Sequence, residues 1–108
     1  MKNVVIYIDV DLTLIDANGK EIDGAVDMVK TLSKEDTRLY LWSTAGQEYC
    51  IKVSKRLGIH ELFEGFGAKP DIVIDDMPNT CTNPFIFNPY EYEKLSDVAK
   101  IIINRHID

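Results

Sequence analysis

The chain has 108 residues, of which 45% are hydrophobic and 28% charged, and its formal net charge is −6 at pH 7. This length suits one core, so we expect a single domain over residues 1–108. The acidic balance argues against a nucleic-acid partner, because phosphate backbones are bound by clustered Lys and Arg. Both cysteines lack metal-ligand spacing, and no apolar stretch approaches the ~20 residues that cross a bilayer. We therefore expect a cytoplasmic protein with no membrane contact.

The first expected element is a buried strand near the start of the chain. Residues 4–8 form an unbroken apolar run, typical of a strand covered on both faces in a parallel sheet. Asp9, Asp11 and Thr13 follow this run at alternate positions. If both aspartates are extended, their side chains point to the same side. Two such anions repel each other, so they need a cation, a shared proton or strong donors.

Helical and strand patterns alternate along the rest of the chain. The pair Asn18-Gly19 predicts a type I′ hairpin within residues 12–22, and Asp23 is expected to cap a helix that ends near Ser33. Strands are expected at 37–42, 63–66, 71–74 and 85–87, and further helices from about 45 to 58 and from about 92 to 105. This order predicts an α/β protein with a three-layer Rossmann-like fold, in which a parallel sheet of about five strands carries helices on both faces.

Polar side chains follow three of the predicted strands. Right-handed crossovers would place the carboxyl ends of these strands at one edge of the sheet, so the polar residues should converge there. An oxygen-only set without His or Cys favours Mg²⁺. The residues in this set are Asp9 and Asp11, Ser43 and Thr44, and Asp75 and Asp76.

The same edge would hold the groups that bind and transfer a phosphoryl group. A hydroxyl at Ser43, the N-terminus of the following helix and the amine of Lys69 are suited to phosphate oxygens. An aspartate beside the metal can attack phosphorus and form an aspartyl-phosphate. The metal and the lysine would offset the charge that develops in the transition state.

These residues resemble the four motifs of the haloacid dehalogenase superfamily of phosphotransferases, over the stretch from Val4 to about Asn88. The first motif resembles residues 9–13, and the second resembles the predicted strand that ends in Ser43. The third corresponds to Lys69, and the fourth to the strand at 72–74 with the acidic pair after it.

The resemblance implies specific roles for the residues after the first strand. Asp9 would be the nucleophile and a metal ligand. Asp11 would be the general acid and base, and its backbone carbonyl would bind the metal. Thr13 would orient the loop. Leu12 stands where the family often has glycine.

The later motifs would complete the site. By the resemblance, Ser43 holds a phosphoryl oxygen, although Thr44 competes for that role and Ser43 could instead cap the next helix. Lys69 would steady the nucleophile and the phosphate. Asp76 would complete the metal site, with Asp75 as a supporting carboxylate.

The spacing between motifs leaves no room for the cap that family members commonly insert. Positions 14 to 42, which are 29 residues, separate Thr13 from Ser43, and positions 44 to 68, which are 25 residues, separate Ser43 from Lys69. Both gaps are filled by the predicted helices and strands. We therefore expect a capless member of the family.

The function expected from this set is a Mg²⁺-dependent phosphomonoester hydrolase acting on a small phosphorylated substrate. A homo-oligomer is favoured as the means of covering an open site, with residues 14–22 of one chain near the site of another. Two alternatives stand beside this hypothesis. One is a receiver-like signalling domain, although the third predicted strand offers only Glu64 as a carboxylate. The other is a phosphatase fold that serves as a non-catalytic phosphate- or metal-binding module.

Overall fold

The computed structural model describes residues 4–74, 85–87 and 95–107 of the chain. The chain forms two compact units, residues 1–69 and residues 70–108. The larger unit contains the first, second and third predicted motifs, and its packing explains how their side chains are placed.

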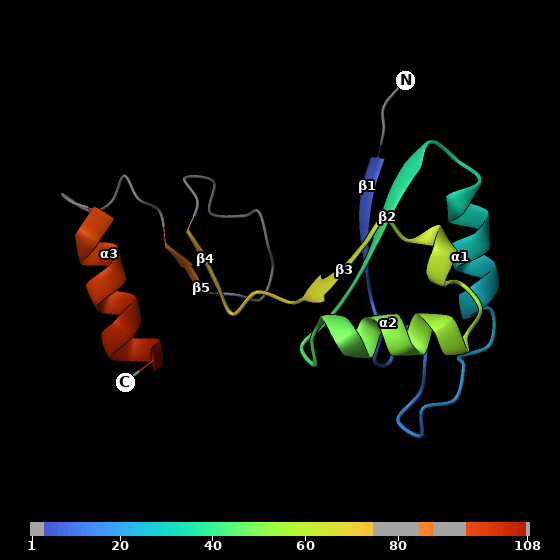
Figure 1. Cartoon of the computed structure of the whole chain (residues 1–108), viewed down its shortest axis with the longest axis horizontal. Coiled ribbons are helices and arrows are strands. Elements are labelled where there is room, and N and C mark those ends of the chain that lie inside the picture. Colours follow the sequence, from blue (N-terminus) through green and yellow to red (C-terminus); the bar gives the residue numbers. More distant parts are fainter. Residues whose placement is uncertain (1–3, 75–84, 88–94, 108) are drawn as a thin grey trace. The chain divides into compact units, whose positions relative to one another are not determined.

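The larger unit is built on a parallel sheet of three strands. Its strands are β1 (Val4–Asp9), β2 (Thr37–Ser43) and β3 (Gly65–Ala68) (Figure 1). Strand β2 pairs with both of the others and lies in the middle. Asp9 is paired with Trp42, and Ser43 is paired with Ala68. All three strands therefore end at the same edge, as the sequence pattern predicts.

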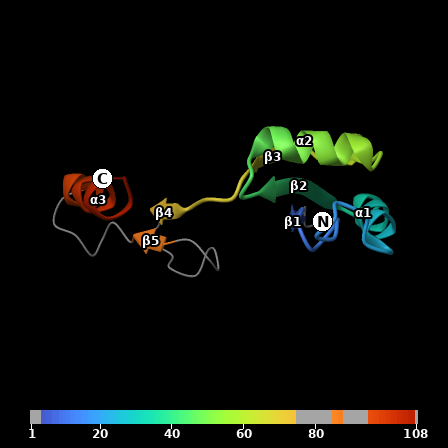
Figure 2. The same ribbon diagram turned by 90° about the horizontal axis from the view of Figure 1, so that it is seen from below.

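Two helices supply the rest of the core. Helix α1 (Ala25–Ser33) connects β1 to β2, and α2 (Gln47–Arg56) connects β2 to β3 through a 3₁₀ turn at His60–Leu62. Figure 2 shows α2 alongside β2 and β3. Alternate residues of the strands pack with both helices in one apolar cluster, which includes Ile8, Val10, Leu39, Leu41, Ala25, Val29, Cys50 and Val53.

The other face of the sheet carries a row of aromatic rings, and β3 begins with a glycine opposite one of them. Tyr7 stacks on Tyr40 with ring centroids 5.1 Å apart and contacts Trp42 at 4.8 Å. A Cβ atom on Gly65 would lie 2.8 Å from the Tyr40 ring, so only glycine fits opposite it. The expected strand at 63–66 is found at Gly65–Ala68, and Phe63 packs in the core.

The segment between β1 and α1 differs in detail from its sequence prediction. Ile15 and Glu21 form a single antiparallel bridge, so the hairpin is short. Gly19 has a φ of +79°, but Asn18 does not have a positive φ, and the predicted type I′ turn is therefore wrong. The Asp16 carboxylate accepts the backbone N–H groups of Asn18 and Lys20 instead, both at 2.9 Å. Helix α1 is capped by Gly24 with a φ of +83°, not by Asp23.

The second unit contains the remaining described elements. Strands β4 (Ile72–Ile74) and β5 (Phe85–Phe87) form a parallel two-stranded sheet, and α3 (Leu95–Ile102) continues into a π-helical turn at Ile103–Ile107. Asp75, Asp76 and residues 92–94 of the expected last helix lie outside the described residues.

The prediction of an α/β protein with parallel strands is confirmed, with three strands in one sheet and two in another. One sheet of about five strands, helices on both of its faces and a single domain over residues 1–108 stay predictions. Among the described residues, no helix combines the length and apolarity needed to cross a membrane.

Candidate active site

Three of the predicted site residues lie at one edge of the three-stranded sheet. Asp9 is the last residue of β1, Ser43 is the last residue of β2, and Lys69 directly follows β3. The backbone N–H of Lys69 donates to the carbonyl of Ser43 at 3.0 Å. This hydrogen bond holds the backbone of Lys69 against the end of β2. Parallel pairing of the strands therefore assembles residues separated by 60 positions of sequence (9 to 69).

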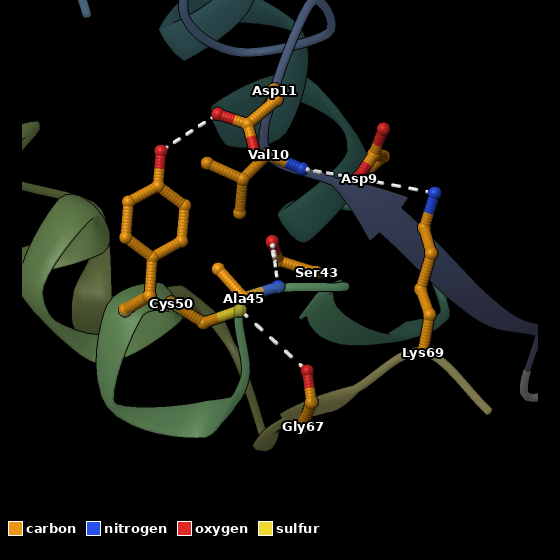
Figure 3. A network of polar contacts seen from close by, with 9 residues as sticks. Asp9, Val10, Asp11, Ser43, Ala45, Cys50, Gly67 and Lys69 are labelled. Atoms are coloured by element: carbon orange, nitrogen blue, oxygen red, sulfur yellow. Dashed lines mark hydrogen bonds and ion pairs between the residues drawn. The ribbon is translucent and has the colours of Figure 1, made fainter. Parts of the chain in front are cut away.

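The Asp9 carboxylate is held by a cation and by the backbone. Its Oδ1 lies 3.3 Å from the Lys69 ammonium nitrogen and accepts the Val10 N–H at 2.9 Å (Figure 3). The Lys69 nitrogen also lies 6.0 Å from the centre of the Trp42 ring. The side chains of Asp9 and Lys69 are 32% and 29% exposed, so the pair is oriented yet open to a substrate.

The loop after β1 is closed by its own backbone. The Val10 carbonyl accepts the N–H groups of Thr13, Leu14 and Ile15 at 3.3, 2.9 and 3.3 Å. Leu14 and Val10 are fully buried and anchor this turn in the core. Thr13 is exposed and takes part in the turn through its N–H, and the loop-orienting role expected for its side chain stays a prediction.

Leu12 adopts a left-handed conformation within this loop. Its φ is +60°, and 73% of its surface is exposed. A residue with a Cβ atom loses roughly 1–2 kcal/mol in this region relative to the right-handed one, whereas glycine does not. The backbone therefore favours glycine at the position that leucine occupies here.

Asp11 belongs to the loop and not to the strand. Strand β1 ends at Asp9, and Asp11 pairs only through an isolated bridge to Ile15. The strand alternation that would direct both carboxylates to one side therefore does not apply. Figure 3 shows Asp9 facing Lys69, whereas Asp11 lies on the other side of Val10.

The partner of Asp11 is a residue that the sequence did not indicate. The hydroxyl of Tyr49, in the first turn of α2, donates to Asp11 Oδ1 at 2.7 Å. This hydrogen bond to Asp11, with partial burial, raises the pKa of Tyr49. In the sequence, Tyr49 is only one member of the apolar face of a predicted helix, so no local signal marks it.

Ser43 and Thr44 differ in their surroundings. Ser43 is fully buried, and its Oγ accepts the N–H of Ala45 at 3.1 Å. It does not cap α2, because the helix is capped by Gly46, whose φ is +100°. None of the described residues accepts the proton of the Ser43 hydroxyl, and Thr44 is exposed beside it. Which of the two contacts a phosphoryl oxygen stays a prediction.

The described residues contain only part of the expected metal site. Asp9 and Asp11 offer hard oxygen donors of the kind that Mg²⁺ prefers. No group of three or more His, Cys, Asp or Glu side chains that could hold a metal occurs within residues 4–74, 85–87 and 95–107. The other two expected ligands, Asp75 and Asp76, lie outside those ranges.

The buried thiol of Cys50 and a hollow at the other ends of the helices are not part of the candidate active site. The Cys50 thiol is buried under β3 and contacts the Gly67 carbonyl at 3.6 Å, and burial raises the pKa of this thiol, so it is a poor nucleophile. A hollow of about 720 Å³ lies beyond the C-terminal ends of α1 and α2 and contains no predicted site residue. Its lysines, Lys30, Lys34 and Lys55, suit the negative ends of the helix dipoles.

Comparison of the chain with protein-family models, with curated proteins and with solved structures finds no match. The chemistry of the site therefore has to be inferred from Asp9, Asp11, Ser43 and Lys69 and from the contacts that they make.

Proposed function

We propose that this protein is a Mg²⁺-dependent phosphomonoester hydrolase of the haloacid dehalogenase type, without a cap domain, that acts through an aspartyl-phosphate on Asp9. The observation that carries the proposal is the contact between Asp9 and Lys69 at the edge where β2 ends in Ser43. A carboxylate, an amine and a buried hydroxyl converge there from three separate strands. Each is a group that can take part in phosphoryl transfer, the carboxylate as nucleophile and the other two as partners of the phosphoryl oxygens.

The residues divide the reaction between them. An Asp9 carboxylate oxygen attacks phosphorus, and the bond between phosphorus and the ester oxygen breaks. Asp11 gives a proton to the departing oxygen. It then takes a proton from the water that attacks the aspartyl-phosphate, which releases inorganic phosphate and restores Asp9. Lys69 and the Ser43 hydroxyl stabilise negative charge on the phosphoryl oxygens.

The metal would be held by the Asp9 carboxylate, the Asp11 backbone carbonyl and Asp76, with Asp75 in support. The oxygen-only donor set fits Mg²⁺ in kind, and the described part of the chain supplies two of its members. When bound, the ion would offset charge on the phosphoryl group and lower the repulsion among the carboxylates.

The two segments between the motifs consist of elements of the fold itself, which supports the proposal that the protein has no cap domain. The chain from Leu14 to Trp42 forms the short hairpin, α1 and β2, and the chain from Thr44 to Ala68 forms α2, the 3₁₀ turn and β3. A small phosphorylated substrate has direct access to such a site. Cover from a second chain of a homo-oligomer is part of the proposal, and light scattering with size-exclusion chromatography tests it.

The receiver-like alternative has less support. Its phosphate-accepting carboxylate would end the third strand, but β3 has the sequence Gly-Phe-Gly-Ala. Glu64, the carboxylate before that strand, is paired with Arg38 at 2.7 Å instead.

A phosphate-release screen with Mg²⁺ tests the proposal. The panel should contain sugar phosphates, nucleotides, phosphopeptides, 3′-phosphorylated oligonucleotides and p-nitrophenyl phosphate. We expect Mg²⁺-dependent release from at least one class of monoester. A purified, folded protein that binds Mg²⁺ but releases phosphate from none of them would favour the non-catalytic module instead.

A further inference from the structure

Helix α2 contacts the loop after β1 at two places. The Tyr49 hydroxyl donates to Asp11 Oδ1 at 2.7 Å, and Arg56 Nη1 donates to the carbonyl of Gly19 at 2.8 Å. The arginine contact fixes the backbone of the hairpin, and the tyrosine contact fixes a carboxylate. These two donors come from opposite ends of the same helix. The first of them acts directly on a side chain with a proposed chemical role.

The geometry gives Tyr49 a rigid position and Asp11 a flexible one. The Tyr49 ring is partly buried and packs against the apolar cluster, so α2 and the core fix its hydroxyl. Asp11 is exposed and lies in a loop, where its carboxylate would otherwise sample several rotamers. No second hydrogen bond to this carboxylate occurs among the described residues, so none of them holds its Oδ2 atom.

We propose that Tyr49 is a positioning residue that holds Asp11 Oδ1, so that Oδ2 delivers the proton to the leaving group. This inference rests on the proposed function. A hydroxyl suits a group that must alternate between acid and base, because it hydrogen-bonds to the carboxyl group in either protonation state. A lysine in its place would favour only the ionised form.

The contact also indicates a substrate class. An alkyl phosphate leaves as an alkoxide, a strong base that needs a proton as the ester bond breaks. An aryl phosphate such as p-nitrophenyl phosphate leaves as a stabilised anion and needs little help. A carboxylate held by a dedicated contact therefore serves alkyl phosphomonoesters, in which the proton from Asp11 Oδ2 passes to the ester oxygen while the Asp9 oxygen bonds to phosphorus.

The test compares Tyr49→Phe with the wild type on two esters, the best alkyl phosphate from the screen and p-nitrophenyl phosphate. The value of kcat/KM reports the first phosphoryl transfer, so it isolates the acid step. We expect kcat/KM to fall about 10-fold or more for the alkyl ester and about two- to threefold for the aryl ester. Tyr40→Phe is the matched control, because it removes a hydroxyl that contacts Arg38 and Glu64 away from the site.

Each result separates the inference from the proposed function. Equal losses on the two esters, with an unchanged circular dichroism spectrum, would overturn the positioning role and leave the hydrolase intact. No turnover of either ester by the wild type would overturn the proposed function, and the inference with it. A selective loss on the alkyl ester in Tyr49→Phe but not in Tyr40→Phe supports both.

Discussion

The two carboxylates after β1 are held in different ways, although one residue separates them. Asp9 ends a strand whose backbone is fixed by the sheet, and its side chain contacts the Lys69 cation at 3.3 Å. Asp11 lies in a loop, and its side chain accepts a hydrogen bond from the neutral Tyr49 hydroxyl at 2.7 Å. Val10, whose carbonyl closes the turn after β1, separates the contact of Asp9 from the contact of Asp11 (Figure 3).

This difference matches the two chemical tasks proposed for the residues. A nucleophilic carboxylate has to be correctly aimed, and the Lys69 ammonium holds one oxygen of Asp9 in place. A general acid and base has to gain and lose a proton in each cycle, which a neutral partner permits. The tertiary structure thus gives two identical side chains two different surroundings.

The largest effect is expected from the nucleophile. Asp9→Asn keeps the shape of the side chain but removes its nucleophilic charge, so turnover of p-nitrophenyl phosphate should fall by at least roughly 1000-fold. Asp27→Asn, on the exposed side of α1, is the matched control and should keep full activity. Near-wild-type turnover by a folded Asp9→Asn protein would remove Asp9 from the mechanism.

Removal of the metal should have the next largest effect and should act on both carboxylates. We expect EDTA to stop hydrolysis and to lower the melting temperature, because a ligand that binds only the folded state stabilises it. That stabilisation is roughly 2.7 kcal/mol at about 100 times Kd. Asp76→Asn should weaken the response to Mg²⁺ in the same thermal titration. Activity and melting temperature that are both indifferent to EDTA would argue against the metal site.

Replacement of Lys69 should separate catalysis from stability. Lys69→Met removes the charge beside Asp9, and kcat should fall by roughly 10²–10³-fold because the phosphoryl oxygens lose a stabilising partner. The free energy of unfolding should change by less than about 1 kcal/mol, because both side chains are partly exposed. Arg38→Met removes the cation of an ion pair with Glu64 that lies outside the proposed site, and it should leave kcat unchanged. A large stability loss in Lys69→Met without a loss of kcat would reverse this assignment.

The smallest effect concerns the strain beside Asp11. Leu12→Gly should raise the free energy of unfolding by about 0.5–1 kcal/mol, because relief of the left-handed conformation exceeds the entropy that glycine adds to the unfolded chain. Little packing is lost, since Leu12 is 73% exposed. Leu12→Ala keeps the strain and should give no gain. Chemical denaturation of the three proteins measures this, and a Leu12→Gly protein that is less stable than Leu12→Ala would exclude the explanation.

Much of the fold is predictable from local patterns. The apolar run before Asp9, the strand at 37–42 and the helix after Gly46 all occur close to their predicted places, because period and turn residues are local properties. The sequence pattern predicts the third strand at 63–66, two residues before the observed strand β3. Its glycines resemble strand breakers in sequence, but Gly65 is required by the Tyr40 ring on the neighbouring strand.

The candidate site shows the same division. The sequence alone placed Asp9 and Ser43 at the ends of strands, because both follow apolar runs. Lys69 directly follows β3 because that strand lies two residues later than the sequence pattern predicts. Only the tertiary structure decided what those groups contact. Tyr49 reaches Asp11 across 38 positions of sequence because α2 packs beside the loop after β1, and a contact over that distance leaves no trace in local periodicity.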